Sequence, residues 1–180
     1  MTVWRPHPPR VEALLAELGI PGELVAGRGL RICDEARELV VVEVGDDGRE
    51  HLLVPVAAEA WRRLRDTALA DGVTVRIASA FRSIDRQVEI IRRKLERGLS
   101  IDSILAVSAP PGYSEHHSGC AVDVITPDSP PLQAGFEQTE AFRWLTENAA
   151  RFHYEMSFPR ENPYGYDYEP WHWCFRGPES

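Results

Sequence analysis

Residues 112–123 read GYSEHHSGCAVD, and this stretch decides the fold that we expect for the chain. His116 lies at the end of a loop, and Asp123 follows inside a segment with the pattern of a β-strand. Gly119 and Ala121 are small, so the backbone and a metal ion can approach each other closely. Imidazole nitrogen and carboxylate oxygen are both good zinc ligands. The stretch therefore predicts a loop that runs into a strand and carries part of a metal site.

A second stretch supplies the groups that the first one lacks. Residues 169–173 read EPWHW, in a segment rich in aromatic residues that would keep bulk water out. His172 is the expected third ligand, and three protein ligands leave one position open, as a catalytic zinc requires. Glu169, three residues before His172, can lie beside the metal without binding it. It is expected to take a proton from water at the metal and to pass it to a leaving amine.

A third stretch, residues 79–87, reads SAFRSIDRQ. Arg82 is placed where a strand ends and a helix begins. Its guanidinium group can stabilise a developing oxyanion or bind a carboxylate. A structural ion pair is the alternative role for this arginine.

The hydrophobic pattern around these stretches predicts an α+β fold, with helices packed on a small antiparallel sheet. The expected helices cover residues 11–18, 57–70, 83–96 and 140–151, and the expected strands cover residues 38–44, 49–54, 73–78, 120–125, 153–158 and 169–175. The turn GDDG at residues 45–48 joins the first two strands into a hairpin. The loops at residues 108–118 and 126–134 are expected to gate a groove at the metal.

The bulk composition is that of one globular domain. The chain has 180 residues, of which 43% are hydrophobic and 27% charged. A net charge of −8 argues against nucleic acid as a partner. The three cysteines do not suggest a disulfide framework, and no apolar run is long enough to span a bilayer. Without a signal-peptide pattern, a cytoplasmic protein is expected unless a leader was removed, and a monomer is favoured.

Together the stretches resemble the VanY/VanX-type D-alanyl-D-alanine peptidases, the LAS group of zinc peptidases in peptidase family M15. The matching patterns are SxHxxGxAxD at residues 114–123, EPWH at 169–172 and SxFRS…Q at 79–87. The resemblance extends over about residues 54–177. It implies a LAS/Hedgehog-like fold that binds one Zn²⁺ per chain. Residues 54–180 would form the catalytic domain, and residues 1–53 an N-terminal extension, a helix and a β-hairpin packed on the core.

The resemblance also implies roles for individual residues. The zinc ligands are matched by His116, Asp123 and His172, the general base by Glu169, and the arginine that polarises the scissile carbonyl by Arg82. Positions near the substrate are matched by Ser114, Ser83, Gln87, Tyr113 and Trp171. The implied activity is that of a zinc D,D-carboxypeptidase, which hydrolyses the terminal D-Ala-D-Ala bond of peptidoglycan stem peptides or precursors.

Three residues depart from the family's pattern. His117 stands where many relatives have Gln, and we expect it to support the site or to be exposed rather than to bind the metal. Cys120 replaces a large aliphatic residue, and Cys174 stands where relatives often carry Arg. Position 174 shares a strand face with His172, so its thiol is expected near the metal, although both cysteines are expected to be buried, reduced thiols.

Other functions remain open on the same scaffold. They are a D-Ala-D-Ala dipeptidase, an L,D-carboxypeptidase, an endolysin-type peptidase, and a non-catalytic module that binds zinc or wall peptide. Glu169 and Arg82 argue against the last of these, because binding alone does not need a base.

Overall fold

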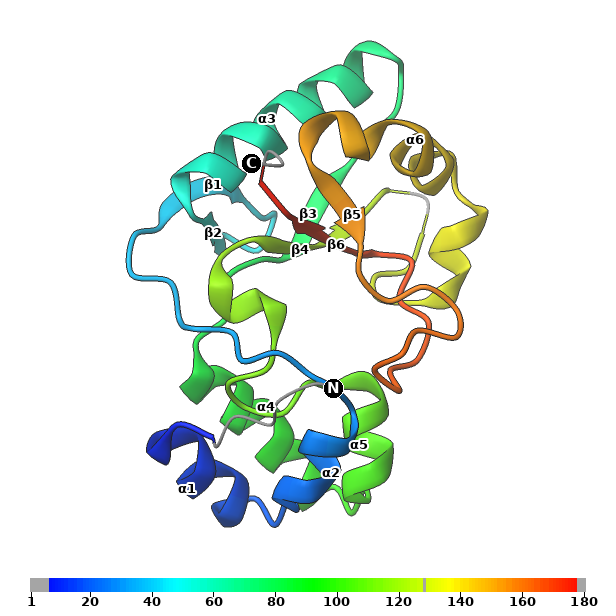
Figure 1. Cartoon of the computed structure of the whole chain (residues 1–180). Coiled ribbons are helices and arrows are strands. Elements are labelled where there is room, and N and C mark those ends of the chain that lie inside the picture. Colours follow the sequence, from blue (N-terminus) through cyan, green and yellow to red (C-terminus); the bar gives the residue numbers. More distant parts are fainter. Residues whose placement is uncertain (1–6, 128, 178–180) are drawn as a thin grey trace.

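A computed structural model of the chain describes residues 7–127 and 129–177 (Figure 1). Its α-helices are α1 (Pro9–Glu17), α2 (Gly22–Gly27), α3 (Pro55–Ala70), α4 (Ile84–Glu96), α5 (Ile101–Val107) and α6 (Glu140–Asn148). Its strands are β1 (Val40–Val44), β2 (Glu50–Leu53), β3 (Arg76–Ser79), β4 (Ala121–Ile125), β5 (Tyr154–Met156) and β6 (His172–Phe175). Its 3-10 turns are η1 (Glu115–Ser118), η2 (Ala134–Gln138) and η3 (Ala149–Phe152). This mixture confirms the expected α+β class.

The central sheet has the strand order β3-β4-β6-β5, and each neighbouring pair is antiparallel. β4 lies inside the sheet, and its residues 121–124 are all buried. Strands buried on both faces are generally made of apolar residues. Asp123 is the single charged residue of β4, and a buried charge needs partners. The pairing register supplies them, because Asp123 lies opposite His172 on β6 and Ser79 on β3.

One hydrophobic core lies between the sheet and the helices α3 and α6. Trp61 and Leu64 of α3 are fully buried in it, together with Val122 and Val124 of β4. Tyr154 of β5 donates a hydrogen bond of 2.9 Å to the carbonyl of Ala57, which ties the edge of the sheet to α3. The hairpin β1-β2 packs against α3 at one side of this layer (Figure 1).

A second core holds α1, α2, α4 and α5 together at the opposite end of the molecule (Figure 1). Leu15, Val25, Ile91 and Ile104 are among its buried residues. The connection from α2 to β1 runs along the loop that precedes β4: Cys33 N–H donates to Gly112 O, and Ala36 N–H to His117 O, each at 2.8 Å. The two cores thus flank the stretch that carries the expected metal ligands.

The N-terminal residues are shared between both cores. Leu15 belongs to the helical core, whereas Val42 and Leu53 belong to the same core as Trp61. The described residues before Val54 therefore pack against both cores, and residues 40–53 form a hairpin. Within the described ranges, no helix combines the length and the apolar character needed to cross a membrane.

The structure adds two short helices, α2 and α5, that the hydrophobic pattern does not predict. Each spans less than two full turns, which is too short to show a helical period. The helix expected over residues 140–151 ends at Asn148 and continues as η3. The Asn148 side-chain amide donates to Trp144 O at 3.0 Å, and such a contact competes with the regular helix backbone.

Candidate active site

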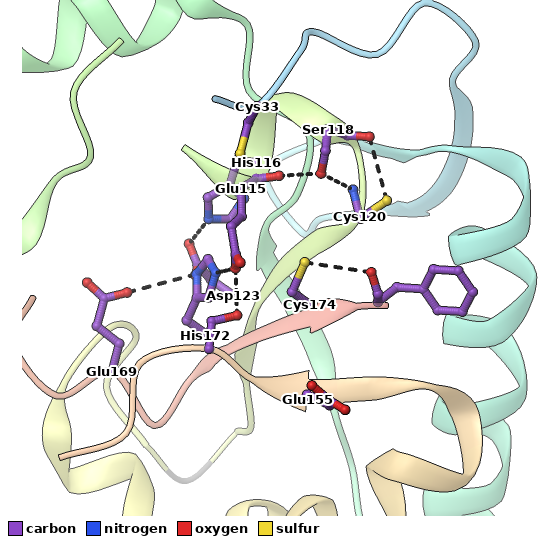
Figure 2. Close-up of polar contacts among 12 residues, drawn as sticks. Cys33, Glu115, His116, Ser118, Cys120, Asp123, Glu155, Glu169, His172 and Cys174 are labelled. Atoms are coloured by element: carbon purple, nitrogen blue, oxygen red, sulfur yellow. Dashed lines mark hydrogen bonds and ion pairs between the residues drawn. The ribbon is translucent and has the colours of Figure 1, made fainter. Parts of the chain in front are cut away.

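Strand pairing places two of the expected metal ligands side by side. Oδ1 of Asp123 on β4 lies 3.1 Å from Nδ1 of His172 on β6. The 3-10 turn η1 carries His116, whose Nε2 lies 3.2 Å from Oδ2 of Asp123. One ligand atom from each residue lies within 4.8 Å of the other two, and all three side chains are buried. Figure 2 shows the three groups converging.

Gly119 allows η1 to turn directly into β4. Its φ of +67° lies in the left-handed region, and a Cβ at this position would lie 3.2 Å from the backbone nitrogen of Val54. That nitrogen donates to Gly119 O at 2.9 Å. The small residue therefore allows the close approach of the hairpin.

The two imidazoles are oriented by hydrogen bonds on their outer sides. Nδ1 of His116 donates to the carbonyl of Ala80 at 2.7 Å, and Nε2 of His172 donates to Oε2 of Glu115 at 2.9 Å. In their neutral forms the rings therefore turn lone pairs toward the carboxylate of Asp123. Two lone pairs and an anion facing one another are stable only with a positive charge between them, which a metal ion or a proton on one of the rings can supply. The donor set fits zinc, with three protein ligands and an open position.

Glu169 lies beside this cluster. Its Oε2 is 3.9 Å from Nδ1 of His172, and in Figure 2 its carboxylate points toward His172 and Asp123. Burial raises the pKa of Glu169 to about 7, although the nearby His172 acts in the opposite direction. A carboxylate with a pKa near neutrality is suited to accept and return a proton.

Arg82 is held against the same cluster by three contacts. Its guanidinium donates to Oε1 of Gln87 at 2.9 Å and to Oγ of Ser79 at 3.1 Å, and it lies 3.8 Å from Oδ2 of Asp123. Gln87 is fully buried and also donates to Ala109 O at 2.7 Å. Gln87 therefore contacts Arg82 from behind and lies outside the pocket wall.

A pocket of about 430 Å³ lies between the sheet and α4, and the candidate ligands, Arg82 and Glu169 all line it. Its wall includes the three candidate ligands together with Arg82, Ile90, Lys94, Val107, Ser108, Ala109, Ser114, Glu115, Leu132, Phe158, Tyr166, Glu169 and Trp171. Two expected substrate residues, Ser114 and Trp171, are therefore in this wall. The wall takes Ser108, Ala109, Ser114 and Glu115 from the loop at residues 108–118, and Leu132 from the described part of the loop at residues 126–134. A second, larger pocket of about 570 Å³ is also lined by residues between 126 and 133. Its wall includes none of the three candidate ligands.

Comparison with known proteins places the chain in a family. The family model for VanY, D-alanyl-D-alanine carboxypeptidase, matches residues 50–178, which include every candidate ligand and Glu169. The chain belongs to the VanY family. It is 34% identical over 129 residues to a D-alanyl-D-alanine carboxypeptidase of Enterococcus faecalis, covering 65% of this chain. Because the match covers 46% of that protein, the chain spans about half the length of the curated relatives it matches.

Solved structures agree with this assignment. The LdcB LD-carboxypeptidase is similar with a TM-score of 0.71 and 27% identity, over 79% of this chain and 70% of that one. A mutant of the vancomycin-resistance D,D-pentapeptidase VanY in complex with Zn(II) has a TM-score of 0.64 and 27% identity, over 83% of this chain and 89% of that one. These likenesses confirm the expected LAS-type fold.

Glu115 is a site residue of this VanY-family chain that the sequence analysis missed. Besides His172, its carboxylate accepts from Oγ of Ser157 at 2.5 Å and pairs with Arg176 at 2.8 Å. Burial alone would raise the pKa of Glu115, but the contacts with His172 and Arg176 lower it to about 2. Its position next to His116 in the sequence is the only signal that could have pointed to it.

Other residues singled out from the sequence lie outside the pocket wall. Ser83 caps α4, since its Oγ accepts from the backbone N–H of Arg86 at 3.1 Å. Tyr113 is buried in the helical core, and its hydroxyl contacts Nδ1 of His7. Nδ1 of His117 contacts the carbonyl of Arg82 at 2.6 Å, and Nε2 accepts from a backbone N–H. His117 is thus held by the backbone on both sides of its ring.

The three cysteines are free thiols. Cys174 is buried as expected, whereas Cys120 is partly exposed, contrary to the expectation, and so is Cys33. Among the residues that the structure describes, the one group arranged to hold a metal consists of His116, Asp123 and His172, without a sulfur ligand. Burial raises the pKa of each thiol.

Proposed function

We propose that the chain is a zinc-dependent D,D-carboxypeptidase that removes the terminal D-alanine from peptidoglycan stem peptides or their precursors. The observation that carries this proposal is the buried cluster of His116, Asp123 and His172, open toward a pocket on the side where Glu169 lies. Membership of the VanY family and the 34% identity to a D-alanyl-D-alanine carboxypeptidase support the choice of substrate.

The residues of the chain divide the reaction between them. When bound, zinc supplies Lewis-acid chemistry, which activates water near neutral pH and polarises a peptide carbonyl. Glu169 takes a proton from the attacking water as the new C–O bond forms. Arg82 donates hydrogen bonds toward the carbonyl oxygen as that oxygen gains negative charge. Glu169 then returns the proton to the departing amine as the C–N bond breaks.

The first experiment exposes the zinc-loaded protein to D-Ala-D-Ala, to a tripeptide and to a pentapeptide stem that end in D-Ala-D-Ala, with products identified by mass spectrometry. We expect release of one D-alanine from the longer peptides. Glu169→Gln should retain zinc and lose about 10²- to 10⁴-fold in turnover, the usual contribution of a general base. Turnover close to that of the parent protein in Glu169→Gln would exclude this mechanism.

A second candidate activity is that of an L,D-carboxypeptidase. The specific observation in its favour is the likeness to LdcB, which has a TM-score of 0.71. Both activities use the same ligands and base, so the site geometry does not separate them. A tetrapeptide stem added to the same panel distinguishes them, because an L,D-carboxypeptidase removes its terminal D-alanine and a strict D,D-enzyme leaves it intact.

A further inference from the structure

A lysine in the pocket wall has no part in the mechanism given above. Lys94 is the only lysine among the 20 basic residues of the chain, and it lies in the last turn of α4. Its Nζ donates to Oγ of Ser108 at 2.7 Å, at the rim of the pocket that contains the metal ligands. An ammonium group has three donors, so the hydroxyl leaves two of them for another acceptor.

In the described part of the chain, Lys94 forms no ion pair. The Glu169 carboxylate attracts the Lys94 ammonium only at longer range, and the Arg82 guanidinium repels it. The ammonium is half-buried, which removes part of its hydration. A partly desolvated cation gains most from an anion that enters the same cavity.

The other cation of the pocket is already engaged. Arg82 is fixed by Ser79 and Gln87 and lies 3.8 Å from a carboxylate oxygen of Asp123, and the proposed function already uses it at the reacting carbonyl. Gln87 and Lys94 lie on the same helix, seven residues apart, which corresponds to about two turns. Lys94 therefore lies about two turns of α4 beyond the residue that holds Arg82, and both cations line the same pocket.

We infer that Lys94, held by Ser108, binds the free carboxylate of the substrate's last residue and makes this site select C-terminal acids. The inference rests on the proposed peptidase function and adds a specificity residue to it. Ile90 and Val107 line the pocket with Lys94, so the wall offers a small apolar surface beside the cation. A carboxylate next to a methyl group is the chemistry of a terminal alanine.

Binding tests the inference separately from catalysis. The probes are acetyl-D-Ala-D-Ala and its C-terminal amide, titrated calorimetrically into the zinc-loaded Glu169→Gln protein. We expect the acid to bind about 10- to 100-fold more tightly than the amide, as for a hydrogen bond to a charged group. Adding Lys94→Met should abolish that preference by weakening binding of the acid, while binding of the amide stays within about twofold.

Arg93→Met is the matched control, because Arg93 is an exposed cation in the same turn of α4 and lies outside the pocket wall. It should leave the preference for the acid intact, whereas Ser108→Ala should reduce it. Equal loss of acid and amide binding in Lys94→Met, or an unchanged ratio, would overturn the inference. A Lys94-dependent preference for the acid in a protein that cleaves no peptide would instead overturn the proposed function and leave the carboxylate site standing.

Discussion

At the scale of single residues, the site depends on how each imidazole is turned. The candidate metal ligands could be named from the sequence because their types and spacing follow zinc chemistry. The groups that orient them could not. Ala80 acts through a backbone carbonyl, which has no sequence signature, and Glu115 is one of 28 acidic residues. The folded structure is needed to show that the Glu115 carboxylate accepts a hydrogen bond from Nε2 of His172.

Zinc affinity should depend on Glu115 although it binds no metal. Glu115→Gln removes the charge that holds His172, and loss of such a partner weakens metal binding by about 10- to 100-fold. Competition with a chromophoric chelator measures this directly. Glu155→Gln is the control, since Glu155 is exposed and lies 3.8 Å from the same arginine, Arg176. Unchanged zinc affinity in Glu115→Gln would show that His172 is oriented without it.

At the scale of elements, the long helices and the strand that carries Asp123 could be predicted because their hydrophobic patterns extend over enough residues. The short pieces could not. α5 has seven residues, and it positions Ser108 directly after its end. The loop at residues 157–171 has no regular pattern, yet it contributes Phe158, Tyr166 and Glu169 to the pocket wall. Much of this wall therefore comes from segments that have no periodic hydrophobic pattern.

The junction of η1 and β4 should tolerate no side chain at Gly119. In Gly119→Ala the Cβ would lie 3.0 Å from Leu39 Cδ2, at a φ of +67°. We expect the free energy of unfolding to fall by about 1–3 kcal/mol, as for other strained backbone positions. Urea denaturation measures it, with Gly135→Ala as the control because a Cβ there meets nothing within 4 Å. Equal stability of both variants would contradict the close approach.

At the scale of the whole molecule, residues that precede the family match brace the pocket. Arg28 donates to the carbonyls of Tyr164 at 2.6 Å and Leu105 at 2.8 Å, and its guanidinium lies 4.4 Å from the centre of the Tyr166 ring. It therefore joins the end of α2 to α5 and to a loop of the pocket wall. The sequence could not predict this contact, because its partners are backbone carbonyls far along the chain.

Loss of the Arg28 contacts should loosen the far wall of the pocket. Arg28→Met should lower the free energy of unfolding by about 1–3 kcal/mol, the cost of leaving buried hydrogen-bond partners unsatisfied. It should also speed hydrogen exchange at the amide of Asp167, which donates to Ala106 O at 2.8 Å. Arg31→Met, a change at an exposed neighbour, should alter neither quantity. Unchanged exchange in Arg28→Met would show that the loop holds itself in place.

In the proposed enzyme, two distant parts of the chain hold one zinc ion between them. A crystal structure of the zinc-loaded protein, with anomalous data at the zinc edge, tests it most directly. We predict one ion bound by Nε2 of His116, Nδ1 of His172 and a carboxylate oxygen of Asp123, each at about 2.0–2.2 Å, with Glu169 nearby and unbound. An ion held by the cysteines, or no ion between His116, Asp123 and His172, would contradict the account.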